Sequence, residues 1–256
     1  MMNKKIMVAF FLIATKFECF AQDVNLDSIK KYFPTTSSGF IINHNYYSLS
    51  YSFTNKLAEW VIYKLTCDQT KGAVNRSNSF RPDPLLKEGS AQLVDYKGSG
   101  FDRGHLAPAG DMKISFEAMS ESFYLTNMTP QHPSLNRGIW LGLEDKVRIW
   151  ACKDSILYVV AGPIIVKSDS TIGPNRLKVP SFFYKIIFHN SRGKYEMIGF
   201  IFPNGPCSMG LGNYVYKVDD IESITGIDFF PFLPDSIENR IENKVNISFW
   251  DLERSQ

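Results

Sequence analysis

The residues best suited to chemistry lie in two segments about thirty residues apart. Residues 98–111 contain an Asp-Arg-Gly-His run at 102–105, and residues 135–144 begin with Leu-Asn-Arg-Gly and end at a glutamate. A histidine can take a proton from water, an asparagine carbonyl can hold a hard cation, and an arginine can neutralise phosphate charge. Hydrolysis of a phosphodiester with one metal ion needs these residue types.

His105 is the expected general base, since a neutral imidazole with an ordinary pKa of about 6.5 accepts a proton at mild pH. Asn136 is the expected metal ligand, because Mg²⁺ keeps several waters and needs only one or two protein oxygens. Glu144 is expected to accept hydrogen bonds from the waters of that metal. Without their neighbours, these three residues would be read as a strand-capping histidine, a helix cap and a solvated carboxylate.

Arginines supply the positive charge that a phosphate needs. Arg103 and Arg148 are candidate phosphate ligands, because a guanidinium offers a planar pair of donors to two oxygens. Arg148 can also pair with Glu144 one helical turn before it. Asp102 is expected to orient the backbone or an arginine rather than to bind metal.

The elements that must position these residues follow from the apolar pattern. A helix is expected from residue 134 or 135 to 151, with tryptophans and aliphatic residues at three- and four-residue spacing on its inward side. Asn136, Glu144 and Arg148 stand at multiples of four along it and would point toward one site. A half-buried hairpin is expected at residues 47–65, a short helix at 115–122 and a strand at 123–128. Further strands are expected at 157–166, 182–188 and 195–202, and short helices after 218.

The first 21 residues have the pattern of a secretory signal peptide. Lys4 and Lys5 precede an apolar run that is about half of the roughly 20 residues needed to span a bilayer. We expect cleavage after Ala21, which predicts a secreted or periplasmic protein without membrane attachment in its mature form. Its loss would leave 25 basic and 25 acidic residues, because three lysines and one glutamate are removed from 28 and 26.

Residues 22–256 are expected to form a single domain, because no linker, charge block or repeat divides them. A neutral domain does not favour tight, passive binding to nucleic acid, which a large positive charge would drive. Three cysteines remain, namely Cys67, Cys152 and Cys207. One disulfide with one free thiol is the simplest arrangement, and three free thiols are the alternative. Their spacing does not indicate structural zinc.

The ordered set of motifs resembles the DNA/RNA non-specific endonuclease family, which includes secreted bacterial nucleases and mitochondrial endonuclease G. The resemblance covers roughly residues 57–205 and rests on the run at 102–105, on Asn-Met-Thr-Pro-Gln at 127–131, and on the segment 136–144. It implies an α+β fold with a mixed, mainly antiparallel sheet, flanking helices and a ββα-metal finger. It also implies a further arginine upstream, for which Arg76 is our choice and Arg81 the alternative, and a supporting role for Asn127.

The same resemblance implies magnesium-dependent, or manganese-dependent, cleavage of both DNA and RNA. Nothing in the sequence resembles a recognition helix or a regular series of base-stacking aromatics, so we expect cutting without sequence preference. Family members often form homodimers, and a homodimer is one expectation. Two alternatives from other classes are an exported nucleic-acid-binding protein with an inactive site and a phosphodiesterase for small nucleotides.

Overall fold

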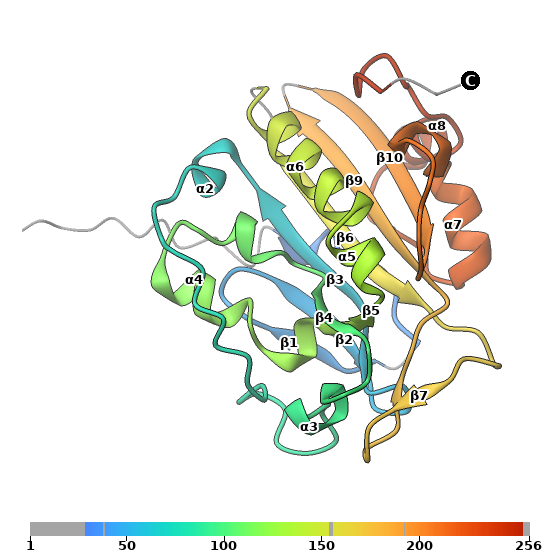
Figure 1. Cartoon of the computed structure of the whole chain (residues 1–256). Helices are drawn as coiled ribbons and strands as arrows, with labels where there is room; N and C mark the ends of the chain where they lie inside the picture. The colour runs from blue at the N-terminus through green and yellow to red at the C-terminus, as the bar shows by residue number, and fades with distance from the viewer. Residues whose placement is uncertain (1–28, 38, 154–155, 192, 253–256) are drawn as a thin grey trace, which may run out of the picture.

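The computed structural model describes residues 29–37, 39–153, 156–191 and 193–252. The predicted signal peptide therefore lies outside the described residues. Within them, no helix is long and apolar enough to cross a membrane. The α+β class expected from the sequence is confirmed, with a seven-stranded, wholly antiparallel sheet at its centre (Figure 1).

The main sheet has the strand order β1-β2-β3-β6-β9-β10-β11. Its strands are β1 (Ile41–Asn43), β2 (Ser48–Ser52), β3 (Leu57–Leu65), β6 (Leu157–Ile164), β9 (Phe182–Ser191), β10 (Lys194–Pro203) and β11 (Val215–Tyr216). Two small sheets pair β4 (Asp102–His105) with β5 (Met128–Gln131), and β7 (Thr171–Ile172) with β8 (Leu177–Lys178).

Short helices connect the strands, and among the described residues only one helix exceeds eight residues. The α-helices are α2 (Cys67–Thr70), α3 (Leu93–Tyr96), α4 (Phe116–Glu121), α5 (Pro133–Asn136), α6 (Ile139–Ala151), α7 (Val218–Thr225) and α8 (Asp235–Glu242). The 3-10 turns are η1 (Ala109–Asp111), η2 (Leu125–Asn127) and η3 (Leu211–Tyr214). The short helix expected at 115–122 is confirmed as α4, which Ser115 caps by accepting a hydrogen bond from the amide of Ala118.

Both faces of the main sheet are covered, so the chain forms two cores. Along β3, Val61 and Tyr63 belong to one apolar cluster and Trp60 and Ile62 to the other, as the alternation of a strand requires. The inward side of α6, including Trp140, fills the first cluster, whereas α7 and α8 contribute to the second. Figure 1 shows α6 along β9 and β6, with α7 and α8 beside β10.

Coverage of both faces corrects the expected half-buried hairpin. Every residue of β2 is buried, including its three serines. The side chain of Ser50 donates a 2.6 Å hydrogen bond to Glu59, while Ile29 and Tyr32 before the sheet join the second cluster. The polar residues that alternate with apolar ones in β2 therefore form buried hydrogen bonds. They do not lie on a solvent-exposed face of the sheet.

The strand expected at 123–128 begins later, because η2 occupies Leu125–Asn127 and β5 starts at Met128. Pro130 lies within β5. β5 pairs only with β4, so the missing N–H of the proline falls on a strand that has one neighbour.

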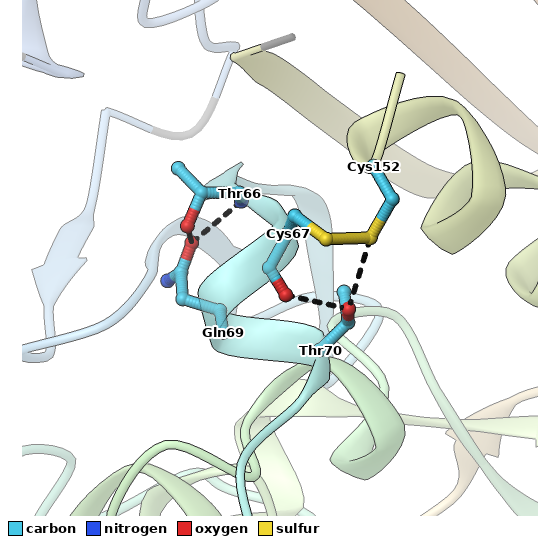
Figure 2. Close-up of a disulfide and its surroundings, with 5 residues drawn as sticks. All are labelled: Thr66, Cys67, Gln69, Thr70 and Cys152. Atoms are coloured by element: carbon cyan, nitrogen blue, oxygen red, sulfur yellow. Dashed lines mark hydrogen bonds between the residues drawn. A yellow bond between two sulfur atoms is a disulfide. The ribbon is translucent and has the colours of Figure 1, made fainter. Parts of the chain in front are cut away.

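A disulfide between Cys67 and Cys152 joins the start of α2 to the residue that follows α6 (Figure 2). Thr66 and Gln69 form a reciprocal cap around the start of α2, and the hydroxyl of Thr70 lies 3.6 Å from the sulfur of Cys152. Cys207 is the free thiol, so the arrangement with one bridge is the one found. A bridge across 85 residues stabilises the fold by about 2–4 kcal/mol and fixes the end of α6.

Candidate active site

β4, β5 and α5 form a compact ββα unit that carries the predicted site. β4 and β5 pair with His105 opposite Met128 and Asp102 opposite Gln131, and α5 packs against β4. Gly104 is required by this pairing, because a Cβ atom there would lie 2.0 Å from the buried side chain of Gln131. The glycine of the Asp-Arg-Gly-His run thus lets the two strands pack closely.

His105 lies in a nearly closed aromatic environment and is 7% exposed. The ring of Phe123 meets it edge-on at 5.0 Å between centroids, and Phe80 lies at 5.8 Å. Its Nε2 atom is buried and has no hydrogen-bond partner among the described residues. An unpaired buried ring nitrogen is costly unless a water or a substrate meets it, so this atom suits a transient proton acceptor.

The His105 ring is neutral at physiological pH. Burial, together with the positive charges of Arg76 and Arg103, lowers its pKa to about 3. An anionic phosphate between these guanidinium groups would offset their charge and raise the basicity of the ring. The substrate-free state therefore holds the histidine in the form that a general base requires.

Asn136, the last residue of α5, is held by an aspartate of β4. Its Nδ2 donates a 2.9 Å hydrogen bond to Oδ2 of Asp102, and Arg137 binds both oxygens of the same carboxylate at 2.8 and 2.6 Å. These hydrogen bonds lower the pKa of Asp102, against the effect of burial. Because the amide nitrogen is engaged, the carbonyl oxygen of Asn136 remains to bind a hard cation. The orienting role expected for Asp102 fits this geometry.

Arg76 lies at the site and Arg81 does not. Arg76 stacks over the ring of Phe123 at 4.9 Å, and its charge acts on both His105 and Glu144. Arg81 donates hydrogen bonds to Ser120 and stacks over Tyr124 at 4.2 Å, which ties it to the end of α4.

The side chain of Arg103 is exposed, whereas the guanidinium of Arg148 is engaged by two carboxylates. The exposed guanidinium of Arg103 stacks on Phe80 at 4.2 Å. The sequence suggested that Arg148 can pair with Glu144. In the structure its Nη1 instead binds Asp111 at 2.8 Å and its Nη2 binds Asp145 at 2.5 Å. Arg148 pairs with Asp111 because the fold brings the buried carboxylate of η1 against α6. The spacing of residues along α6 does not predict this contact.

Glu144 is buried rather than solvated, with 8% of its surface exposed. Its Oε1 lies 3.9 Å from Nζ of Lys185, a fully buried lysine that stacks over the ring of Trp140 at 4.4 Å. Burial raises the pKa of Glu144 to about 7, with Lys185 opposing this effect and Asp111 adding to it. A carboxyl group with a pKa near 7 ionises fully when a cation lies beside it.

The supporting residues are satisfied internally. Asn127 is fully buried and exchanges hydrogen bonds with the backbone of Ala107 while donating to the carbonyl of Ser122, so it fixes the chain after His105. The three remaining histidines contact other parts of the fold. His44 pairs with Asp83, His132 caps α5 and the ring of His189 contacts the backbone of Lys194.

No group of three or more His, Cys, Asp or Glu side chains surrounds His105 in the described parts of the chain. A cation at this site would therefore depend on the amide of Asn136, with the remaining positions left to water. This donor set fits magnesium, which keeps most of its water in proteins.

Comparison with known proteins identifies the fold family. A sequence model of the DNA/RNA non-specific endonucleases matches residues 25–236. The chain belongs to the DNA/RNA non-specific endonuclease family. This confirms both the resemblance drawn from the motifs and the classification as a nuclease, a hydrolase.

Two relatives and one solved structure illustrate the similarity. The mitochondrial nuclease EXOG of Xenopus laevis is 35% identical, over 81% of this chain and 63% of its own length. A nuclease of Nostoc is 33% identical, over 82% of this chain and 80% of its own. The crystal structure of the EndoG/EndoGI complex contains a chain with a TM-score of 0.76 and 31% identity, covering 82% of this chain and 92% of that one.

The same relatives correct the expected localisation. EXOG of Xenopus laevis and endonuclease G of cattle and humans are named as mitochondrial nucleases. The prediction of a secreted or periplasmic protein is therefore wrong. It relied on residues 1–21 alone, where a basic start followed by an apolar run does not by itself distinguish one targeting segment from another.

Proposed function

We propose that this endonuclease hydrolyses phosphodiester bonds in DNA and RNA without sequence preference, with His105 as general base and a divalent cation on Asn136. The observation that carries the proposal is the buried, neutral His105 beside Arg76 and Arg103. A phosphodiester repels hydroxide, so its hydrolysis needs a base for water and positive charge at the phosphate. This ββα unit supplies both.

Each residue has one task in the proposed reaction. His105 takes a proton from the attacking water, while Arg76 and Arg103 bind the phosphate oxygens and stabilise their growing charge. Asn136 would hold the cation through Oδ1, and Glu144 would accept hydrogen bonds from its waters. When bound, Mg²⁺ or Mn²⁺ supplies positive charge to the phosphate and to the departing 3′ oxygen.

Arg148 takes a supporting task rather than a direct one. Both of its Nη atoms already bind carboxylates, and only 19% of its side chain is exposed. It neutralises Asp111 and Asp145 close to Glu144, so that the negative charges around the cation site do not accumulate.

The first test is digestion of supercoiled plasmid and of bulk RNA by the full chain, with Mg²⁺ and with EDTA. We expect both polymers to be cut with the metal, and neither with EDTA. A chromogenic small diester serves as the third substrate. An enzyme that cut only the small diester would be a nucleotide phosphodiesterase, and a protein that bound the polymers without cutting them under several divalent metals would be a binding protein.

The two upstream arginines offer a matched pair of variants. We expect Arg76→Ala to lower kcat/KM on plasmid by about 10²–10³-fold, the usual effect of removing one donor from a developing oxyanion. Arg81→Ala should leave kcat/KM within a few-fold and lower the free energy of unfolding by about 1–3 kcal/mol, because it removes charged hydrogen bonds to Ser120. The opposite pattern in activity and thermal unfolding would assign the phosphate to Arg81.

A further inference from the structure

Three carboxylates from the two C-terminal helices meet on the sheet face opposite the candidate active site. Asp219 and Glu222 stand three residues apart on α7, and Glu242 is the last residue of α8. One oxygen from each lies within 4.8 Å of the others. Neighbours at this helical spacing share a face, so two of the three point the same way.

Glu242 is the member that sets this cluster apart from an ordinary acidic surface. It is only 4% exposed, and its Oε1 is buried without a hydrogen-bond partner. Within the described chain, no lysine or arginine forms a salt bridge with any of the three carboxylates. Lys217, at the start of α7, donates instead to Asn243. A buried carboxylate with neither a donor nor a counter-ion is costly, so its retention indicates a positive ligand.

The surrounding charges strengthen this argument. Burial, together with the neighbouring carboxylates, raises the pKa of Glu242 to about 9 and that of Glu222 to about 7. Asp228 and Glu238 add to the negative charge around them. Oε1 of Glu222 is fixed by the amide of Phe229 at 2.7 Å, which leaves its second oxygen free. Such a site either holds protons or binds a cation.

We propose that Asp219, Glu222 and Glu242 form a second divalent-cation site, of the calcium class, that joins α7 to α8. Two Ca–O bonds of about 2.5 Å span roughly 5 Å, which accommodates oxygens within 4.8 Å of one another. Calcium also accepts a variable number of oxygen ligands in a flexible geometry, whereas magnesium demands a near-ideal octahedron. Asp219 and Glu222 are half-buried, so water can complete the coordination.

The site is separate from the candidate active site. Val218 and Ile221 of α7 and Ile241 of α8 pack in the second core cluster, whereas Trp140 and Leu143 of α6 pack in the first. The main sheet therefore lies between the proposed cation site and the candidate active site. A cation here would hold the C-terminal helices on β10 and would not take part in hydrolysis.

The test uses the full chain with Asn136→Ala, which removes the proposed catalytic ligand, and titrates CaCl₂ by calorimetry. We expect one Ca²⁺ per chain. At a Ca²⁺ concentration about one hundred times Kd, Tm should rise by roughly 5–10 °C. Adding Glu242→Gln should abolish both the binding heat and the shift. In EDTA this variant should unfold at the same or a higher temperature than its parent, because a buried acidic group whose Oε1 has no hydrogen-bond partner is gone.

Asp220→Asn is the matched control, since Asp220 is exposed on the same helix beside Asp219. It should keep both the binding heat and the Tm shift. If Glu242→Gln fails to fold, Glu222→Gln replaces it with the same expectations. The proposal is overturned if the parent binds no Ca²⁺ up to about 10 mM, beyond the range of weak calcium modules. It is equally overturned if Asp220→Asn loses the shift, which would indicate general charge screening.

Discussion

His105→Ala is expected to lower kcat on plasmid and on RNA by about 10²–10⁴-fold, the range that loss of a general base produces. The reason is the isolation of the ring, because Nε2 has no partner in the described structure and the other histidine of the ββα unit, His132, is engaged in capping α5. KM should change little, since Arg76 and Arg103 remain to bind phosphate. Initial rates at saturating Mg²⁺ measure the effect.

The control for this variant is His189→Ala, which alters a histidine of the main sheet and should keep full activity. Thermal unfolding must accompany the kinetics, because removing a ring packed against Phe80 and Phe123 leaves a cavity. If folded His105→Ala protein kept activity within about tenfold of the parent, the base would be another group.

The pH profile provides an independent check on the same residue. A base must be unprotonated to act, and the pKa of His105 in the free protein is lowered to about 3 by burial and by Arg76 and Arg103. Protonation of His105 therefore should not reduce kcat/KM between pH 8 and 6.5. An acid limb of kcat/KM centred at the ordinary histidine pKa of about 6.5 would contradict the buried, neutral ring.

The sequence could place the motif residues on one unit of the fold, because they are close together in the chain. Asp102 and His105 share β4, and the strand that pairs with it carries the next motif. Local spacing was enough to place these groups on one unit. The sequence left two candidates for the upstream arginine, Arg76 and Arg81. The structure distinguishes them by their packing, because Arg81 stacks on Tyr124 and Arg76 stacks on Phe123.

The helix expected over residues 134–151 shows where local spacing fails. It is divided into α5 and α6 by Gly138, where a Cβ would lie 2.3 Å from the carbonyl oxygen of Ser134. Asn136 and Glu144 therefore do not lie on one continuous helix. Their spacing of eight residues does not place their side chains on the same helix face. Its orientation comes instead from Asp102, 34 residues earlier.

Two charged residues near Glu144 were missed, for different reasons. Asp111 binds Arg148 across 37 residues, and no sequence pattern reports such a contact. Lys185 did leave a signal, as the only charged residue in the apolar stretch 182–188 of β9. Strand alternation places it on the same face as Phe183 and Ile187, toward α6. A lysine inside a buried strand should be read as the partner of an acidic side chain on the covering helix.

Asn136→Ala is expected to lower activity, compared with the parent at equal protein concentration, by more than about 100-fold. Residues that only support a metal ligand typically cost about 10–100-fold when they are removed. Asp102→Ala should fall within that lower range, because it leaves the ligand in place but frees its amide to rotate. The decisive measurement is the Mg²⁺ concentration that gives half-maximal activity. It should rise in both variants, and further in Asn136→Ala.

An exchange of the two side chains tests the hydrogen bond itself. Asn136→Asp keeps an oxygen ligand, yet it places two carboxylates where a 2.9 Å hydrogen bond stood, so repulsion should impair it. Asp102→Asn in the same chain restores a donor and an acceptor in reversed order. We expect the double variant to recover much of the activity lost by Asn136→Asp, at the cost of the Arg137 ion pair. If the two substitutions were merely additive, Asp102 would not orient the metal ligand, because coupled residues depart from additivity.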